Sequence, residues 1–325
     1  MSAHPDVAAI VIGRNEGQRL RRCLTSLQGQ VGQLIYVDSG STDGSSDLAA
    51  GLGASVIRLD PSRPFTAARG RQEGFQALAA SGAPDFVQFV DGDCAVEPGW
   101  IAAGRTALVD DPKLGLVTGW RSEVAPGDSI YNALCDFEWH RPAGDIQTCG
   151  GDMMVRCTAF NAAGGFRADV IAAEDDEFCA RLGHAGWKLR RLPLAMTRHD
   201  AAMSRFSEWW RRAIRSGHGF AQVGHLHPHW FRAERRRVLA YGAMLPVLAL
   251  AGLIWSGWLV VLVVGLYALS YGRTLQGLMR AGLPAANAAH QGLFLSLSKF
   301  PNLIGMALYH WRVMRGRAMQ IIEYK

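Results

Sequence analysis

Short apolar runs alternate with amphipathic stretches over the first 200 residues of the chain. Four runs have the length and composition of buried parallel strands: residues 7–12, 34–37, 55–59 and 86–90. The intervening stretches place apolar residues at helical spacing, as within residues 16–28. This alternation predicts an α/β fold with a mostly parallel sheet flanked by helices, and ligands bound at the carboxyl ends of the strands.

The pattern changes near residue 225, where a basic segment leads into a long apolar one. Residues 238–271 contain no charged residue, and this run exceeds the roughly 20 residues that cross a bilayer. Ser256-Gly257 divides the run, which predicts two short crossings or a re-entrant hairpin over about 238–272, followed by interfacial helices. We therefore expect an α/β domain over residues 1–225 and a C-terminal helical membrane region over residues 226–325.

Charge is distributed unevenly, although the net value is only +6. Nine arginines and three acids lie between Arg198 and Arg237. This block lacks the interleaved aromatic residues and the motifs of nucleic-acid-binding proteins, so we expect no nucleic-acid partner. Its position before the apolar run predicts contact with anionic membrane lipids, with the α/β domain facing the cytoplasm at the cell inner membrane.

Cysteine usage and the N-terminus agree with a cytoplasmic domain. The six cysteines are scattered without CxxC pairing, which is typical of reduced thiols. Residues 1–6 show no basic stretch followed by an apolar one, so no signal peptide is expected.

Asp91-Gly92-Asp93 directly follows the predicted strand at residues 86–90. Two carboxylates two residues apart at a strand end can both face one hard cation, Mg²⁺ or Mn²⁺. Such a cation would neutralise a diphosphate leaving group. The tripeptide taken alone is a weak signal, and a polar loop after a strand is its more common explanation.

A second acidic feature is the run of four acids from Glu174 to Glu177. Like charges in proximity raise one another's pKa, and a carboxylate with a raised pKa is suited to act as a general base. The alternative is a solvated first turn of a helix over residues 174–184, favoured by the helix dipole.

Five sequence blocks, in this order, resemble the family 2 glycosyltransferases, which have the GT-A fold. The blocks are IVIGRNE (10–16) with CLTSL (23–27), VDSGSTDGS (37–45), ARGRQEG (68–74) before the acidic tripeptide, CGGDMMV (149–155) with GGF (164–166), and AEDDEF (173–178). The resemblance covers about residues 6–220. The chain departs from the family at Ser39, where Asp is common, at Gly13-Arg14 and at Gln72, which affects the expected nucleobase contacts.

The resemblance implies roles for individual residues of the donor site. Glu16 and Asp38 would lie near the nucleobase and ribose, with Arg71 lining the same pocket. Asp93 would be the closer metal ligand, and Asp91 would lie nearer the ribose or the metal.

Further roles concern the acceptor and the leaving group. Asp175 matches the family's general base, while Gly151, Asp152 and Glu174 would shape the acceptor pocket. His199 would approach the metal or the diphosphate, although a structural histidine is an equal alternative. Two arginines would add positive charge at the leaving group or would instead face lipid: Arg212 and Arg215.

The function expected from these features is inverting sugar transfer. A nucleotide diphosphosugar, UDP- or GDP-linked, would donate its sugar to a hydroxyl of a lipid-linked or cell-surface saccharide acceptor at the cytoplasmic membrane face. The alternative is a non-catalytic membrane scaffold with a nucleotide-binding-like domain. That alternative gives no reason for Asp93 and Asp175 to occur together, so it is the less favoured.

Overall fold

The computed structural model describes residues 4–82 and 84–323. Part of the N-terminal segment in which no signal peptide is expected, residues 1–3, lies outside the described residues. The chain forms two compact units. The first comprises the residues up to Asp128 together with Cys135–Ala202, and the second comprises Ser129–Leu134 and the residues from Met203 onwards.

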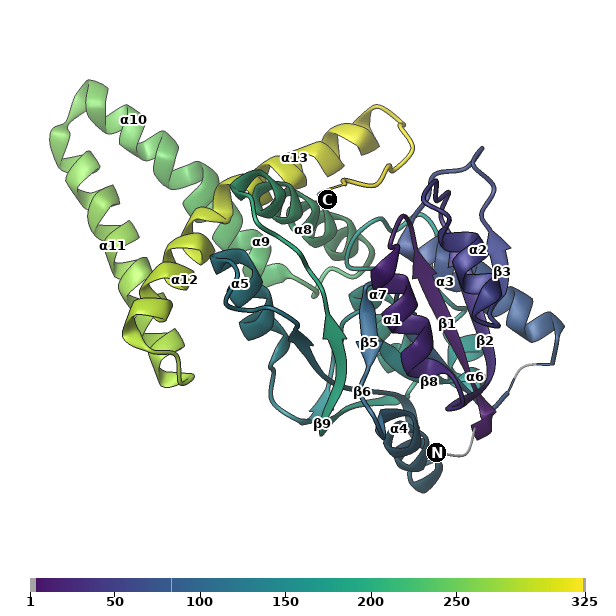
Figure 1. Ribbon diagram of the computed structural model, residues 1–325. Helices are drawn as coiled ribbons and strands as arrows, with labels where there is room; N and C mark the ends of the chain where they lie inside the picture. Colours follow the sequence, from purple (N-terminus) through teal and green to yellow (C-terminus); the bar gives the residue numbers. More distant parts are fainter. Residues whose placement is uncertain (1–3, 83, 324–325) are drawn as a thin grey trace. The chain divides into compact units, whose positions relative to one another are not determined.

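A nine-stranded sheet, counted over the described residues, organises the first unit (Figure 1). Its strands are β1 (His4–Gly13), β2 (Val31–Asp38), β3 (Ser55–Arg58), β4 (Phe86–Asp91), β5 (Cys94–Val96), β6 (Leu114–Glu123), β7 (Gly144–Ile146), β8 (Met153–Arg156) and β9 (Lys188–His199). The spatial order is β3-β2-β1-β4-β8-β6-β9-β5, and β7 pairs with β9.

The sheet has a parallel half and a mixed half. Strands β3, β2, β1 and β4 are parallel, as the apolar runs predict. Beyond β4, strand β8 is antiparallel to both β4 and β6, and β9 is parallel to β6. Strands β5 and β7 are antiparallel to β9. The four strands predicted from the apolar runs are confirmed, with β1 and β2 each beginning three residues earlier than expected.

Helices of the first unit cover both faces of this sheet. They are α1 (Gln18–Leu27), α2 (Ser45–Gly51), α3 (Ala67–Ala80), α4 (Trp100–Asp110), α6 (Cys157–Ala162) and α7 (Glu174–His184). Helix α5 (Ile130–Trp139) begins in the second unit and ends in the first. The side chains of β1 alternate between the faces, because successive strand residues point in opposite directions. Val7, Ala9 and Val11 join the core with α1, α2 and α4.

Helix α3 packs on the opposite face of β1 at unusually close range. A Cβ at Gly74 would lie 2.7 Å from Ile10 and 2.9 Å from Val37, and one at Gly70 would lie 3.2 Å from Ile12. Only glycine allows this approach. The close packing fixes the position of Arg71, which lies between the two glycines, beside the carboxyl ends of the strands.

A cluster of phenylalanines on this same face supports α7. Phe75, Phe89, Phe160, Phe166 and Phe178 stack with ring centroids 3.9–5.8 Å apart. All five rings are buried or nearly so. Because Phe178 belongs to α7, this packing anchors the helix whose first turn carries Glu174 and Asp175.

The second unit is helical. Its elements are α8 (Phe206–Leu226), α9 (Arg232–Leu239), the π-helical turn η1 (Ala240–Met244), α10 (Leu245–Trp255), α11 (Gly257–Arg280), α12 (Ala285–Leu297) and α13 (Lys299–Met314). Helices α8 and α13 cross at backbone contact, since a Cβ at Gly217 would overlap Asn302 and one at Gly305 would overlap Ile214. The compact unit begins at Met203, so it includes α8, whereas the sequence pattern changes near residue 225.

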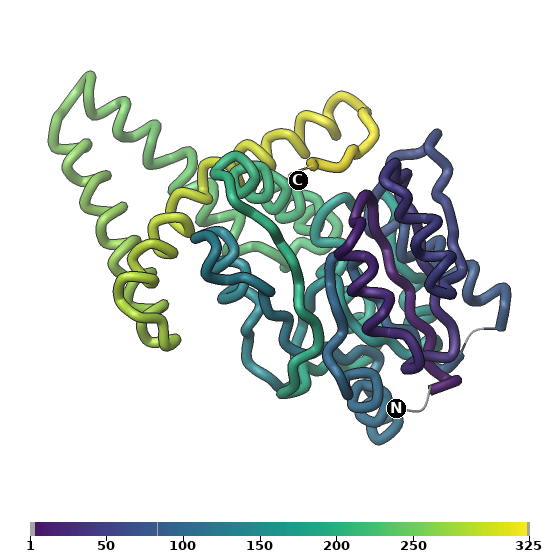
Figure 2. Tube along the Cα trace, viewed as in Figure 1, coloured from purple at the N-terminus to yellow at the C-terminus, as the bar shows by residue number. Residues whose placement is uncertain are grey.

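Two helical stretches of the described residues have the length and apolar composition needed to cross a membrane. They are Arg232–Trp255 and Gly257–Arg280, of 24 residues each. The chain trace shows α10 and α11 lying side by side as a hairpin (Figure 2). The hairpin turns at Ser256, where the sequence predicts the break, and Trp255 and Trp258 at its tip are 79% and 80% exposed.

Candidate active site

The candidate site begins at the carboxyl ends of β2, β1 and β4. In the sheet register Gly13 pairs with Asp38, and Ile12 pairs with Asp91. The two aspartates therefore lie on either side of the end of β1. A Cβ at Gly92 would lie 3.0 Å from the Ile12 carbonyl oxygen, so the chain after β4 passes directly over this strand end.

The residues predicted to hold the nucleobase and ribose gather around the end of β1. Asp38 is almost fully buried, and its carboxylate accepts hydrogen bonds from the Tyr36 hydroxyl (3.1 Å) and the Ser41 amide (3.0 Å). Glu16 pairs with Arg19 at 2.9 Å. Positions for added Cβ atoms at Gly13 and Gly92 lie 3.2 and 3.3 Å from the Glu16 side chain, which places it beside both turns.

Arg71 joins the acidic tripeptide to the acidic helix α7. Its guanidinium donates to Asp91 Oδ1 at 2.6 Å and to Glu174 Oε1 at 2.7 Å, and the side chain is buried. Burial alone would lower the pKa of Arg71, but Asp91 and Glu174 outweigh it and raise that pKa. The guanidinium is therefore charged and ties two segments that are 83 residues apart in sequence (Asp91 and Glu174).

Gly151 packs directly on this ion pair. A Cβ at position 151 would overlap the Arg71 guanidinium and would lie 3.0 Å from Asp91 Oδ2. A Cβ at Gly150, in contrast, would meet nothing within 4 Å. The glycine loop therefore covers the ion pair at residue 151 and leaves open space at residue 150.

Arg121 holds the other side of Asp91. It contacts Asp91 Oδ2 at 3.3 Å and Asp152 Oδ2 at 2.8 Å. Burial pushes the pKa of Asp91 upward, but Arg71 and Arg121 outweigh this and lower it, so Asp91 is ionised. No motif of the sequence includes Arg121. It reaches the site from β6 through the mixed half of the sheet, which short apolar runs do not reveal.

Asp152 lies beneath the site. Its side chain is fully buried, Oδ1 accepts from the Asp91 amide (3.0 Å), and Oδ2 accepts from Thr197 (2.7 Å) and Arg121. Both oxygens are thus engaged within the protein. Asp152 therefore holds Asp91 and Arg121 in position. It lies below the surface of the site, whereas the sequence predicts that it contacts the acceptor.

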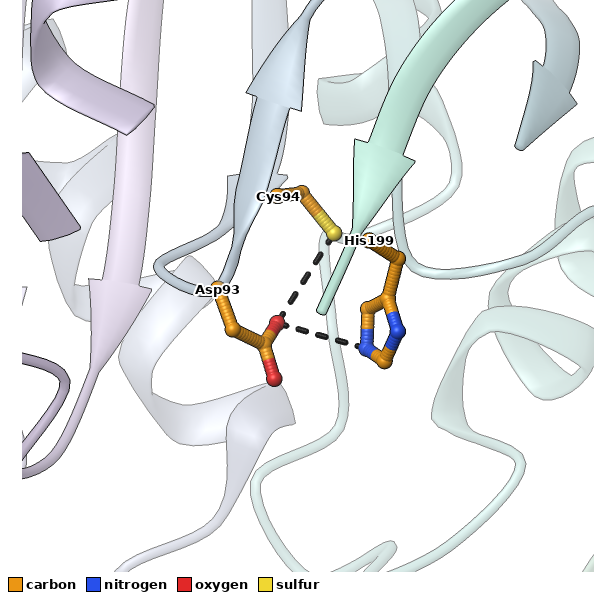
Figure 3. A group of neighbouring side chains, drawn as sticks. All are labelled: Asp93, Cys94 and His199. Atoms are coloured by element: carbon orange, nitrogen blue, oxygen red, sulfur yellow. Dashed lines mark hydrogen bonds and ion pairs between the residues drawn. The ribbon is translucent and has the colours of Figure 1, made fainter. Parts of the chain in front are cut away.

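Asp93 and His199 form a second cluster, with Cys94 between them in the view of Figure 3. His199 Nε2 lies 3.4 Å from Asp93 Oδ1, and its Nδ1 lies 3.5 Å from Glu123 Oε2. Burial lowers the pKa of His199, but Asp93 and Glu123 outweigh it, and the pKa is raised. The Cys94 thiol lies 3.7 Å from Asp93 Oδ1.

The donor atoms of this cluster fit a divalent cation. Asp93, Cys94 and His199 each offer a ligand atom, and these atoms lie within 4.8 Å of one another. A carboxylate oxygen and an imidazole nitrogen suit Mn²⁺, and Mg²⁺ takes the carboxylate. The sequence predicts both Asp93 and His199 as metal-site residues, and the structure brings their side chains together. Glu123, which orients the histidine, carries no sequence signal of its own.

Asp175 lies on the first turn of α7 and is partly exposed. The predicted helix over residues 174–184 is confirmed at both ends. Burial and the charge of Glu174 raise the pKa of Asp175 from 3.8 to about 6, against the lowering effect of Arg71. The pKa of Asp176 is also raised, chiefly by burial and by Asp175. The acids thus begin a helix, as one explanation of the acidic run expects, and the role of Asp175 as a base stays a prediction.

The backbone before Asp175 is strained. Ala173 adopts a φ of 56°, in the left-handed region that residues other than glycine rarely occupy. This turn directs the chain into α7 and sets the orientation of Glu174 and Asp175.

Arg212 and Arg215 lie on α8, in the second unit. Their predicted role near the leaving group stays a prediction.

Comparisons with known proteins agree with this geometry. Residues 8–168 match the family model of glycosyl transferase family 2. A pre-mycofactocin glycosyltransferase from Mycobacterium tuberculosis is 29% identical over 238 residues, which cover 70% of this chain and 49% of that protein. The chain thus spans about half the length of this relative.

Solved structures share the fold. A mannosyltransferase from Pyrobaculum calidifontis, in complex with GDP-Man and Mn²⁺, has a TM-score of 0.58 at 19% identity, covering 95% of this chain and 88% of that one. Residues 1–349 of TarS from S. aureus give 0.52 at 16% identity, covering 98% and 92%. The GT-A fold expected from the sequence is confirmed, and the chain belongs to glycosyl transferase family 2.

Proposed function

We propose that this chain is an inverting glycosyltransferase that moves a sugar from a UDP- or GDP-linked nucleotide diphosphosugar to an acceptor hydroxyl. The observation that carries the proposal is the double ion pair of Arg71. The guanidinium pairs with Asp91, at the carboxyl end of β4, and also with Glu174, the neighbour of Asp175. A group that binds the donor and a group with the pKa of a base are thereby fixed relative to each other.

The donor nucleoside binds over the end of β1. Glu16 and Asp38 meet the nucleobase and ribose there, and the rigid backing of Asp38 by Tyr36 and Ser41 supports this role. Asp91 faces the ribose or the cation. Since both of its oxygens are held by arginines, Asp93 is the closer metal ligand.

Asp93 and His199 are the residues that would hold Mg²⁺ or Mn²⁺. When bound, the cation would neutralise charge on the diphosphate leaving group. Two observations support the assignment: the 3.4 Å approach of the two side chains, and the shared fold of a mannosyltransferase solved with Mn²⁺. Arg212 and Arg215 are proposed as further positive charge for the leaving group.

Asp175 is the general base. A carboxylate with a pKa of about 6 is ionised near neutral pH and is still basic enough to take a proton in the transition state. The acceptor oxygen forms its bond to the anomeric carbon as the bond to the diphosphate oxygen breaks, and the hydroxyl proton passes to Asp175. Attack from the face opposite the leaving group inverts the anomeric configuration.

The acceptor lies between the glycine loop and α7. Gly151 and Glu174 line this pocket. Gly151 covers the Arg71 side chain, and Glu174 pairs with it. Asp152 acts from below, by positioning Asp91 and Arg121.

The second unit holds the enzyme at the cytoplasmic face of the cell inner membrane. The apolar hairpin and the exposed arginines of α9, Arg232, Arg236 and Arg237, support contact with membrane lipids. A lipid-linked or surface-polysaccharide precursor is the acceptor class that this location favours.

The test is transfer by the full-length protein in detergent or nanodiscs. UDP-, GDP- and dTDP-sugars are offered with lipid-linked and free saccharide acceptors, with Mn²⁺, with Mg²⁺ and with a chelator. We expect cation-dependent transfer from one nucleotide class and, by NMR, a product of opposite anomeric configuration to the donor. A product of retained configuration would contradict inversion, and nucleotide-sugar binding without any turnover would favour the scaffold.

A further inference from the structure

We infer that Asp93, Cys94 and His199 form a three-ligand centre for a thiophilic divalent cation, Zn²⁺, held through the Cys94 sulfur. The centre overlaps the pair proposed above for Mg²⁺ or Mn²⁺, so Zn²⁺ competes with those cations. The competition rests on the proposed function, whereas the zinc centre itself does not.

Two distances between donor atoms are close to those of a tetrahedral zinc site, and all three donor atoms lie within 4.8 Å of one another. Bond lengths of about 2.0 Å to oxygen and nitrogen and about 2.3 Å to sulfur separate tetrahedral ligands by about 3.3 Å (O to N) and about 3.5 Å (S to O). The structure has 3.4 Å between Asp93 Oδ1 and His199 Nε2, and 3.7 Å between Asp93 Oδ1 and Cys94 Sγ. Figure 3 shows one Asp93 carboxylate oxygen joined by dashed lines to the Cys94 sulfur and to the His199 imidazole, which lie on the same side of it. Little rearrangement is needed for one cation to contact all three.

The backbone holds these ligands in place without the cation. Cys94 and His199 are direct partners in the β5–β9 antiparallel ladder. The Asp93 carbonyl accepts from the Asp200 amide at 3.1 Å, which extends the pairing by one residue on each strand. A ligand set on paired strands is more rigid than one on loops.

Glu123 lies beside the Nδ1 atom of His199. Its Oε2 lies 3.5 Å from Nδ1, on the side of the ring opposite Asp93. A proton on Nδ1 that faces Glu123 leaves the Nε2 lone pair directed at the Asp93 oxygen, as in carboxylate–histidine–zinc arrangements. Glu123 is itself held by the Ala201 amide at 3.1 Å.

Charge near the centre also favours a cation. The carboxylates of Asp91, Asp93, Glu123 and Asp152 surround it, and the guanidinium of Arg121 is engaged by two of them. A competing set, Asp91, Cys94 and Asp152, also lies within ligand distance. Its carboxylates are already bound by Arg71, Arg121 and Thr197, so the set with Asp93 and His199 is favoured.

The sulfur decides which cation binds this way. Thiolate ligands select Zn²⁺ and Co²⁺ over Mg²⁺ and Mn²⁺. Zn²⁺ binding displaces the thiol proton to solvent as the S–Zn bond forms. Three protein ligands leave the fourth tetrahedral position open.

Cobalt binding tests the centre directly. Co²⁺ is titrated into metal-free, full-length protein in detergent, without donor or acceptor. We expect a thiolate-to-cobalt charge-transfer band and the visible bands of tetrahedral Co²⁺, both abolished by an equivalent of Zn²⁺. The bands are absent in Cys94→Ser and present in Cys157→Ser, a matched buried cysteine on α6.

Affinity measurements complete the test. Cys94→Ser should weaken Zn²⁺ binding by about 10–100-fold and change Mn²⁺ binding, followed by EPR, less than about threefold. Octahedral Co²⁺ bands, or unchanged Zn²⁺ affinity in a Cys94→Ser protein with wild-type melting, would overturn the centre. Zn²⁺ that binds without displacing Mn²⁺ would overturn the competition. Neither readout needs sugar transfer, so failure here is distinguishable from failure of the proposed function.

Discussion

Asp175 lies between two other acids on the first turn of α7, and its raised pKa of about 6 supports its proposed role as the general base. If its ionised form accepts the acceptor proton, activity follows the ionised fraction. We predict that kcat/KM falls about tenfold for each pH unit below about 6. A pH–rate profile measures this.

Glu174→Gln provides the comparison for that profile. The charge of Glu174 is the largest effect that raises the pKa of Asp175 after burial, so its removal lowers that pKa and moves the acid limb to lower pH. An acid limb that stays in place would show that another group titrates.

The same raised pKa has a cost in stability. Because the folded state raises the pKa of Asp175 above its ordinary value of 3.8, the ionised carboxylate destabilises the fold above about pH 6. We predict that Asp175→Asn melts at a higher temperature than wild type at about pH 8, and that the difference vanishes at about pH 4.

Asp169→Asn is the control of opposite sign. The hydrogen bond from Arg167 lowers the pKa of Asp169, so its ionised form stabilises the fold and its loss lowers the melting temperature at neutral pH. The effect should be small, since this pair is exposed. An Asp175→Asn protein that is less stable than wild type at high pH would contradict the claim that the ionised Asp175 carboxylate destabilises the fold.

Gly151 and Gly150 form a matched pair of neighbouring glycines. A methyl group at residue 151 would displace the Arg71–Asp91 ion pair, whereas one at residue 150 would meet open space. We predict that Gly151→Ala lowers kcat/KM by about 100-fold, the scale of a misplaced catalytic group, and that Gly150→Ala stays near wild type. Equal activities of the two variants would show that activity does not depend on the Arg71–Asp91 ion pair.

Site residues inside sequence motifs were predictable, whereas site residues that only the pairing of strands brings into place were not. Asp91 and Asp93 were proposed from their place at a strand end, and the family resemblance supported them and singled out Asp175 within the acidic run. Arg121 and Glu123 lie on β6 outside any motif, and only the pairing of β6 with β8 and β9 brings them to Asp91 and His199. Long-range pairing of this kind leaves no local pattern in one sequence.

At the scale of elements, the close contact between α3 and β1 fixes the position of Arg71 in the candidate site. Gly74→Ala would push a methyl group against Ile10 and Val37. We predict a loss of about 1–3 kcal/mol in the free energy of unfolding, typical of an overpacked core. Denaturant unfolding measures the change.

Gly183→Ala on α7 is the matched helical control. It faces open space and is exposed, so the added methyl group should stabilise the protein by about 0.5–1 kcal/mol. Equal effects of the two substitutions would show that the close approach of α3 is unimportant.

The parallel half of the sheet was predictable because its strands are continuous apolar runs. The mixed half was not, because β9 interrupts its apolar residues with Arg190, Arg191 and Arg198. Of these, Arg190 pairs with Asp145 and Arg198 pairs with Glu97. Polar strands of this kind resemble loops when read along the sequence alone.

At the scale of the whole molecule, the apolar hairpin is the feature on which the proposed membrane location depends. A helix of 24 residues rises about 36 Å, enough to cross a hydrocarbon core of about 30 Å. Leu262 on α11 is 53% exposed, and an arginine there would cost about 2.5–3.5 kcal/mol on insertion. We predict that Leu262→Arg weakens retention in membrane pellets after carbonate extraction.

Val109→Arg is the control for the membrane prediction. Val109 is similarly exposed, at 49%, but lies on α4 of the first unit. Its substitution should leave retention unchanged. Equal retention of both variants would contradict insertion of the hairpin.

The central claim is a division of labour, in which Asp93 holds the cation and leaving group while Asp175 activates the acceptor. Calorimetry of nucleotide diphosphate binding with Mn²⁺, paired with single-turnover transfer, separates the two roles. Asp93→Asn should lose the cation-dependent part of nucleotide binding. Asp175→Asn should bind the nucleotide as wild type does and lose about 10²–10⁴-fold in turnover. Full turnover by Asp175→Asn, or an equal loss of nucleotide binding in both variants, would contradict the claim.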